Sequence, residues 1–297
     1  MIETEKLRNV GILGHGGAGK TSLGEAMLFA AGATQRLGRV EDGTSVFDFE
    51  PEEIKRHISI STAFHSLSWK EFYLNLIDTP GYATFLADSI NCMRAFEGAV
   101  FLLSPSTGLK VETEKLWAHA NDYQISRLIF ISKMEREKSN TREAIEAIFN
   151  GLEAKGVSLQ LPIGVEEGFK GVVDLPLMKA FIFEGDSGKF SQTEIPDDLK
   201  KTAQEMRVQL LESVAEADDA LLEKYLDGQE LSLEELKKGI RGGILKGKLL
   251  PVFYGSAARQ IGIPQLLDAV VDYLPSPLDG GEVQGKNPVT GEPEKRA

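Results

Sequence analysis

The feature that most constrains the fold of this chain is a glycine-rich octapeptide near its beginning. Residues 14–21 read Gly-His-Gly-Gly-Ala-Gly-Lys-Thr and fit the pattern G-x-x-x-x-G-K-[ST]. An apolar run at 10–13 precedes the octapeptide, and apolar residues recur behind it at helical spacing. A strand, a loop and a helix in this order make an anion site, because the unpaired N–H groups and the helix dipole both favour phosphate. The octapeptide therefore predicts a phosphate-binding loop.

Within this loop, Lys20 is expected to reach the β- and γ-phosphates, and the hydroxyl of Thr21 is expected to bind Mg²⁺. A chance match or a dinucleotide site is the alternative, and the order of strand, loop and helix argues against both. The residues of the segment assigned to nucleotide binding are Gly14, His15, Gly16, Gly17, Ala18, Gly19, Lys20, Thr21 and Ser22.

Composition excludes several other classes of protein. The chain has 297 residues, enough for about two domains of ~150 residues. No apolar run approaches the ~18 residues of a membrane span and the first residues do not resemble a signal peptide, so we expect a cytoplasmic protein without membrane contact. Its single cysteine excludes an internal disulfide. The net charge of −12 argues against direct DNA binding. A monomer is expected.

Apolar strand-like runs alternate with helical patterns, which predicts an α/β fold with a doubly wound, mainly parallel sheet. Two loosely alternating runs, 58–67 and 72–77, predict a hairpin added to that sheet. The segment from Pro275 to the end shows no pattern and predicts a linker. The other expected elements are strands at 99–104, 127–132 and 251–255 and helices at 112–123, 141–155 and 264–273.

Residues 164–247 interrupt this alternation. Strand-like runs at 171–175 and 179–184 are followed by a helical and acidic stretch. Because elements typical of the core resume beyond it, we expect an inserted α+β subdomain. The nucleotide-binding domain would then comprise 1–163 and 248–277, and 278–297 would be a linker toward further domains.

A second motif narrows the class of ligand that the chain is expected to bind. The apolar run 74–77 ends in Asp78-Thr79-Pro80-Gly81. Asp78 can hold the Mg²⁺ shell, and the N–H of Gly81 can approach the γ-phosphate because glycine carries no Cβ. An ordinary turn after a strand is the alternative. Upstream, Ser59 is a candidate second hydroxyl for Mg²⁺ on a loop ordered by the γ-phosphate, or else a surface serine.

The loops after two later strands are expected to recognise the base, at the carboxyl edge of the sheet. The carboxylate of Glu135 can accept from guanine N1–H and the 2-amino group, while the stem of Lys133 lies along the ring. Backbone N–H groups of the second loop can meet guanine O6. A solvated turn is the alternative for the first of these loops. The residues assigned to the base are Ser132, Lys133, Glu135, Ser256, Ala257 and Ala258.

Together these segments resemble the GTPase domain of bacterial elongation factor G, and more narrowly the elongation factor G-like proteins of the second type. The similarity covers residues 9–277 and includes, beyond the motifs above, the segments 38–44, 169–175, 222–226, 251–257 and 266–277. The resemblance implies an Mg²⁺-dependent GTPase that binds GTP and GDP and acts on the ribosome. It gives functional roles to Lys20, Thr21, Ser59, Asp78, Gly81, Lys133, Glu135, Ser256 and Ala257.

The chain also departs from the family's pattern. Tyr82 stands in place of the histidine that orients the attacking water, which threatens hydrolysis rather than binding. Gly16 and Gly17 replace an apolar residue and an aspartate. Loss of the apolar side chain is expected to open one half of a hydrophobic gate whose other half is Ile58. The base motif Asn-Lys-x-Asp has become Ser-Lys-Met-Glu at 132–135.

The predicted function is that of a GTP-binding translational GTPase, slow alone and stimulated on the ribosome, with Lys20, Gly81 and Tyr82 as catalytic residues and Thr21, Ser59 and Asp78 around the metal. The alternative is a nucleotide-sensing module with little or no turnover. By resemblance, the acidic insert is a candidate contact for the ribosomal stalk protein, although a solvated helical face explains the same charges.

Overall fold

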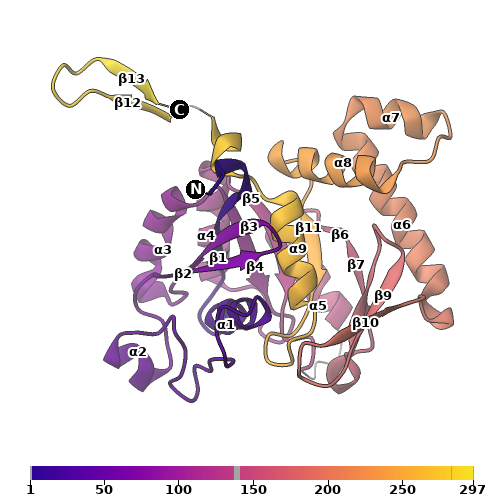
Figure 1. Cartoon of the computed structure of the whole chain (residues 1–297), viewed down its shortest axis with the longest axis horizontal. Coiled ribbons are helices and arrows are strands. Elements are labelled where there is room, and N and C mark those ends of the chain that lie inside the picture. Colours follow the sequence, from indigo (N-terminus) through magenta and orange to yellow (C-terminus); the bar gives the residue numbers. More distant parts are fainter. Residues whose placement is uncertain (1, 137–140, 282, 297) are drawn as a thin grey trace.

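A computed structural model describes residues 2–136, 141–281 and 283–296 of the chain. Within these residues one sheet comprises β1 (Leu7–Leu13), β2 (Ala63–Trp69), β3 (Phe72–Asp78), β4 (Gly98–Leu103), β5 (Ser126–Ile131), β6 (Val157–Ser158) and β11 (Pro251–Tyr254). Its strand order is β2-β3-β1-β4-β5-β11-β6 (Figure 1). All neighbours are parallel except β2 and β3, which form the expected antiparallel hairpin.

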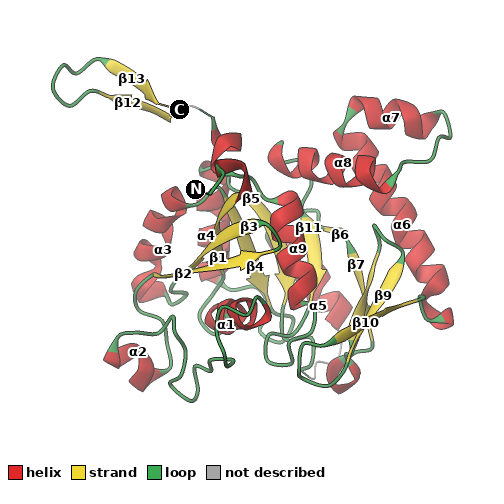
Figure 2. Cartoon of the chain, viewed as in Figure 1, coloured by secondary structure: helices red, strands yellow, loops and turns green. Residues whose placement is uncertain are grey.

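Alternate side chains of the central strands enter two cores, one on each face of the sheet. In β4, Val100 and Leu102 belong to one core, whereas Ala99, Phe101 and Leu103 belong to the other. Because both faces are buried, the strand is apolar throughout, as is typical of parallel sheets. Two helices, α1 (Lys20–Ala30) and α9 (Ile263–Tyr273), cover the first face of the sheet. Three helices, α3 (Leu86–Cys92), α4 (Val111–Asp122) and α5 (Thr141–Gly151), cover the second (Figure 2). The doubly wound, mainly parallel α/β class is confirmed.

Several boundaries differ from the expected ones. β2 begins at Ala63, because the amides of residues 60–62 bind side-chain carboxylates instead of a strand. The helix expected over 141–155 ends at Gly151, before the left-handed backbone at Glu153. The sequence pattern also missed α2 (Pro51–Arg56). Short 3-10 helices are η1 (Thr4–Lys6), η2 (Ala83–Phe85), η3 (Met93–Ala95) and η4 (Glu166–Gly168).

The C-terminal segment shows no sequence pattern, yet it is structured. The expectation that it lacks regular structure was wrong. After η5 (Pro277–Gly280), β12 (Val283–Lys286) pairs antiparallel with β13 (Pro293–Arg296). The side chain of Asn287 accepts from two amides in the connecting turn, which fixes the hairpin without apolar alternation. The hairpin projects away from the main body (Figure 1). Among the described residues, the structure holds no helix long and apolar enough for a membrane span.

The insert forms a second sheet and a group of helices. Strands β7 (Gln160–Ile163), β8 (Gly171–Asp174), β9 (Lys179–Phe183) and β10 (Phe190–Thr193) pair antiparallel. The chain continues through α6 (Asp197–Ala217), α7 (Asp219–Leu226) and α8 (Leu233–Leu245) before it returns to the main sheet. An inserted α+β subdomain is confirmed. Its second sheet already includes β7, ahead of the expected boundary at residue 164.

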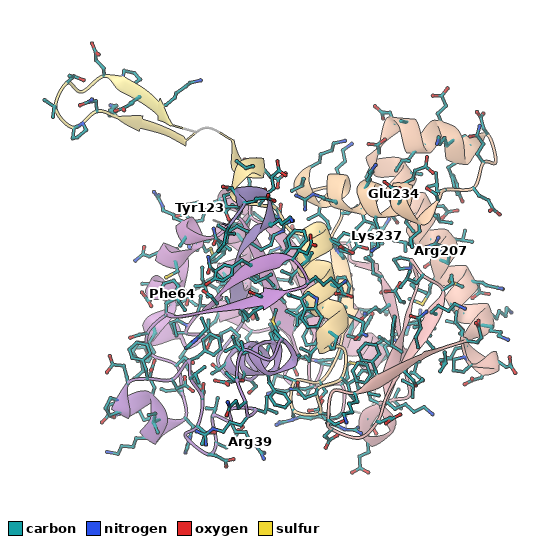
Figure 3. The ribbon with its side chains drawn as sticks, viewed as in Figure 1. Arg39, Phe64, Tyr123, Arg207, Glu234 and Lys237 are labelled. Atoms are coloured by element: carbon teal, nitrogen blue, oxygen red, sulfur yellow. The ribbon has the colours of Figure 1, made fainter. Side chains whose placement is uncertain are left out.

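The insert packs on α9 through a polar contact region. Lys237 on α8 pairs with Asp272 on α9 at 2.7 Å. Nearby, Arg207 on α6 donates to the carbonyls of Leu175 and Pro176. Figure 3 shows Arg207 and Lys237 on the insert, on the side of α9. In the β8–β9 turn Asp174 accepts from the Leu177 amide at 2.8 Å, and burial raises the pKa of Asp174 to about 6.

We expect Asp174→Asn to stabilise the protein at pH 8. A pKa of about 6 in the folded state exceeds the ordinary value of 3.8, so native stability falls as pH rises between those values and stays low above them. Asparagine keeps the acceptor for the Leu177 amide without a charge. The free energy of unfolding should therefore rise by roughly 1–3 kcal/mol at pH 8 and by much less at pH 4.

Urea unfolding at both pH values measures this difference, with Asp122→Asn on the exposed end of α4 as the control. Equal effects of Asp174→Asn at pH 4 and pH 8 would contradict the assignment of the raised pKa to this carboxyl.

Candidate functional site

A cavity of about 580 Å³ lies at the carboxyl ends of the central strands. Because those strands are parallel, the loops that leave them meet at one edge of the sheet. The residues that line the cavity include 16–22, 37–41, 57–59, 81–82, 132–133, 135–136 and 257–259, and the insert adds Asp186. The structure thus brings the two phosphate motifs and the two base loops into one site.

Glycines shape the phosphate loop behind β1. Gly17 and Gly19 have φ of 80° and 102°, a left-handed backbone that L side chains rarely adopt. Gly19 is also the N-cap of α1, so the helix N-terminus faces the cavity. Lys20, the first residue of α1, is buried and donates from Nζ to the carbonyl of His15 at 3.1 Å. Burial lowers the pKa of Lys20 to about 8.

The side chain of His15 supports this loop from behind. Its ring nitrogens lie 3.3 Å from the hydroxyl of Thr113 and 3.0 Å from that of Thr107. Burial, with a smaller effect of Lys20, lowers the pKa of His15 to about 4. The ring is therefore neutral near pH 7, and His15 faces the site through its backbone.

Oxygen atoms from three segments converge beside Thr21. Its hydroxyl donates to Asp78 Oδ2 at 2.6 Å and lies 3.0 Å from the hydroxyl of Ser59. The other carboxylate oxygen, Asp78 Oδ1, is buried and has no hydrogen-bond partner within the described part of the chain. Ser59 in turn donates to Asp48 at 3.2 Å, a contact that the sequence pattern did not suggest.

These groups fit Mg²⁺, which prefers oxygen ligands and is usually bound by one or two carboxylates together with substrate phosphates and water. Among the described residues, no cluster of three His, Cys, Asp or Glu side chains could hold a metal ion alone. Burial raises the pKa of Asp78 to about 7, so a cation at this position would favour its charged form.

The first base loop lies against the phosphate loop. Lys133, with a φ of 59°, donates from Nζ to the carbonyl of Gly17 at 2.5 Å. Ser132 donates from its hydroxyl to the carbonyl of Ala18 at 3.1 Å, so serine keeps a link between the two loops. Glu135 lines the cavity, and its Oε2 is buried with no hydrogen-bond partner among the residues that the structure describes. A buried acceptor of this kind fits the donor groups of guanine.

The second base loop corrects one expectation. The amide of Ser256 donates to the carbonyl of Ile261 at 3.0 Å and the residue is fully buried, so this amide cannot also meet guanine O6. Ala257 and Ala258 line the cavity instead. Residues 257–258 therefore remain the candidates in this loop for a contact with O6.

The segment after β3 touches the phosphate loop directly. The amide of Gly16 donates to the carbonyl of Gly81 at 2.8 Å. A Cβ on Gly81 would lie 2.5 Å from the backbone C of His15 and 2.6 Å from the backbone N of Gly16, so only glycine fits. The ring of Tyr82 lies over Gly16. The expectation that a missing side chain at residue 16 opens a gate was therefore wrong, because Tyr82 fills that space.

Residues 5–276 match the model of a family described as the elongation factor Tu GTP binding domain. The chain belongs to this family. It is therefore a GTP-binding domain of the translational GTPase type. A crystal structure of a protein from Thermus thermophilus is 31% identical, with a TM-score of 0.87, over 94% of this chain and 42% of that one. The chain thus spans less than half the length of that protein.

In this GTP-binding domain the insert reaches the base loop through Arg259. Its Nε donates to Asp186 at 2.9 Å, and its Nη1 donates to the carbonyls of Glu167 and Phe169 at 3.1 and 3.0 Å. Asp186 itself lines the nucleotide cavity. Nothing in the sequence pattern indicated this contact, because it joins segments far apart in the chain.

A buried carboxylate in the GTP-binding domain, that of Glu53, fixes the segment around Ser59. Glu53 accepts from the amides of Ile60 and Ser61 through Oε1 and from those of Phe49 and Glu50 through Oε2, at 2.8–3.1 Å. The side chain is fully buried. Glu53 stands three residues after the N-cap Glu50 in a capping box, a pattern that could have indicated one of these contacts.

Two further carboxylates fix the ends of the same segment. Glu25 on α1 accepts from the hydroxyl of Ser45 and the amide of Val46 at 2.8 and 2.5 Å. Asp88 on α3 accepts from the amide and the hydroxyl of Thr62. The position of Ser59 beside Thr21 therefore depends on acidic side chains that do not line the cavity.

We expect Glu53→Gln to loosen this segment. A glutamine amide has one acceptor oxygen, so two buried amides lose their partner, at about 1–3 kcal/mol each. The free energy of unfolding should fall by roughly 2–4 kcal/mol, and limited proteolysis should cut more quickly between residues 45 and 62.

The matched control is Glu52→Gln on the same helix, where the exposed side chain pairs with Arg56 at 2.9 Å. Its effect should stay within about 0.5 kcal/mol. Equal losses in the two variants would show that Glu53 does not hold the segment.

Proposed function

We propose that this chain is the GTPase domain of an elongation factor G-like protein of the second type, which hydrolyses GTP to GDP with Mg²⁺ in connection with the ribosome. The observation that carries the proposal is the meeting, in one cavity, of the phosphate loop, Gly81 and the unpartnered carboxylate oxygen of Glu135. A triphosphate needs the first two groups, and guanine needs the third.

The phosphate side of the nucleotide would be bound by Lys20 and the amides of 16–22. Thr21, Ser59 and Asp78 would hold Mg²⁺. When bound, that ion neutralises charge on the phosphate oxygens. Gly81 brings the backbone after β3 against the loop, so its amide is our candidate contact for the γ-phosphate. Glu135 and Lys133, with residues 257–258, would hold the base.

The domain boundaries of the proposal approximately follow the division between the seven-stranded and the four-stranded sheet. Residues 1–163 and 248–277 form the GTP-binding domain, 164–247 form the insert, and 278–297 connect to further domains. The position of β7 in the second sheet favours a start of the insert near residue 160.

Turnover by the domain alone would be slow, at about 10⁻⁴–10⁻² s⁻¹. A stimulating partner adds about 10³–10⁵ in switch GTPases. Tyr82 supports a second candidate function, a guanine-nucleotide sensor with little turnover, because a tyrosine hydroxyl accepts a proton less readily than a histidine ring.

The partners proposed for the protein follow the family. The ribosome is the main partner, chiefly through domains outside this chain. The acidic surface of α6–α8 is the candidate contact for the stalk protein. We place the protein in the cytoplasm and propose that it acts as a monomer.

Base recognition by Glu135 predicts an order of affinities. Inosine lacks the 2-amino group of guanine, so ITP leaves part of the buried carboxylate unpaired, and it should bind roughly 10- to 100-fold more weakly than GTP. ATP should bind more weakly still. Titration of the chain with GTP, ITP, XTP and ATP measures this order.

In Glu135→Gln the preference for GTP over ITP should shrink, whereas Glu41→Gln, on the exposed rim of the same cavity, removes a charge without touching the base. Equal native affinities for ITP and GTP would show that Glu135 does not read guanine. Tight ATP binding would overturn the proposed function.

The role of Tyr82 in hydrolysis predicts a difference on the ribosome. In the full-length protein, Tyr82→His should raise the ribosome-stimulated single-turnover rate by about 10²-fold or more, the usual contribution of a positioned general base. The rate without ribosomes should change much less. A native protein that responds to ribosomes as strongly as the histidine variant would contradict the idea that Tyr82 limits turnover.

A further inference from the structure

Two positions at which the chain departs from the family's pattern are in direct contact. A Cβ on Gly16 would lie 2.8 Å from each of three ring carbons of Tyr82, closer than the 3.0 Å that real Cβ atoms respect. Unlike Gly14, Gly17 and Gly19, Gly16 does not have a left-handed φ. The φ of residue 16 is therefore compatible with a side chain, and the atoms nearest to an added Cβ are those of the Tyr82 ring.

The contact is anchored on both sides. The amide of Gly16 donates to the carbonyl of Gly81 at 2.8 Å, and the carbonyl of Tyr82 accepts from Phe85 at 2.9 Å at the start of η2. Gly16 and Tyr82 both line the nucleotide cavity. The side chain of Tyr82 is 43% exposed, so the ring lies on the loop without being locked in a core.

We propose that Gly16 and Tyr82 form a matched pair in which the Tyr82 ring covers the phosphate loop and slows the release of nucleotides that carry a γ-phosphate. The ring occupies the space that a side chain of residue 16 would take. The two substitutions therefore replace one cover of the phosphate loop, that side chain, with another, the Tyr82 ring. Its position next to Gly81, the candidate γ-phosphate contact, limits the effect to triphosphates. This inference rests on the proposed function.

The pairing itself is tested without nucleotide, by hydrogen–deuterium exchange of peptides that span residues 79–86. Gly16→Ala adds only a Cβ, which displaces the ring, so exchange in these peptides should rise about tenfold. In the Tyr82→Ala background the same Cβ meets no ring, and Gly16→Ala should change exchange less than about twofold. Equal effects of Gly16→Ala in the two backgrounds overturn the pairing.

Release is tested by dissociation of fluorescent GDP and of a non-hydrolysable GTP analogue from the same four proteins. Gly16→Ala and Tyr82→Ala should each speed release of the GTP analogue by about tenfold, and the double variant should be no faster than Tyr82→Ala alone. Release of GDP should change less than about twofold. Additive effects, or equal effects on GDP and the GTP analogue, overturn the inference.

Tyr82→Phe keeps the aromatic ring and removes the hydroxyl, so it separates the effects of the two groups. Slow release of the GTP analogue from this variant supports a role of the ring, and release as fast as from Tyr82→Ala overturns it. If the native chain binds no guanine nucleotide, the proposed function fails and the retention role fails with it. The exchange experiment still decides whether Gly16 and Tyr82 are paired, so the two failures are distinguishable.

Discussion

The nucleotide site depends on the parallel pairing of β1 with β3. Its register sets Ile12 opposite Asp78, so the phosphate loop and the segment from Asp78 onward leave the same edge of the sheet side by side. Gly81 then comes so close to the backbone of His15 and Gly16 that no Cβ fits between them. A register shift by one residue would turn Asp78 to the opposite face of the sheet and separate it from Thr21. Two of the proposed metal ligands, Thr21 and Asp78, and the proposed γ-phosphate contact therefore all depend on one strand pairing.

The parts of this arrangement that the sequence predicts correctly are those with local signals. The phosphate loop combines left-handed glycines with a strand and a helix that adjoin it in the chain. The central strands are apolar throughout because both faces are buried, and β4 shows this directly in its alternate contacts with two cores. The inserted subdomain was recognisable because its acidic, helical composition differs from the elements on either side.

The parts that the sequence could not predict depend on contacts across distance. Glu53 accepts from the amides of residues 60–61, and Arg259 donates to carbonyls in the insert. Neither contact has a periodic pattern. The amide of Ser256 was assigned to the base although it closes a turn with Ile261. The terminal hairpin escaped notice because a turn around Asn287, and not apolar alternation, sets its register. Glu53 and Arg259 therefore have partners in other segments, whereas Ser256 and Asn287 have partners a few residues away in turns that no periodic pattern marks.

The contact between Gly16 and Tyr82 alters the effect that is expected of each substitution. Taken separately, a glycine in the loop removes a cover, and a tyrosine in place of histidine removes a base. In the structure the Tyr82 ring lies where a side chain of residue 16 would begin. The tyrosine therefore offsets the loss of the side chain at Gly16. The base is not replaced, because covering a loop requires only an aromatic surface, whereas activating water requires a proton acceptor. In our proposal, retention of the nucleotide depends on an aromatic ring at residue 82 and the rate of hydrolysis depends on a proton acceptor there, so the two properties are separable.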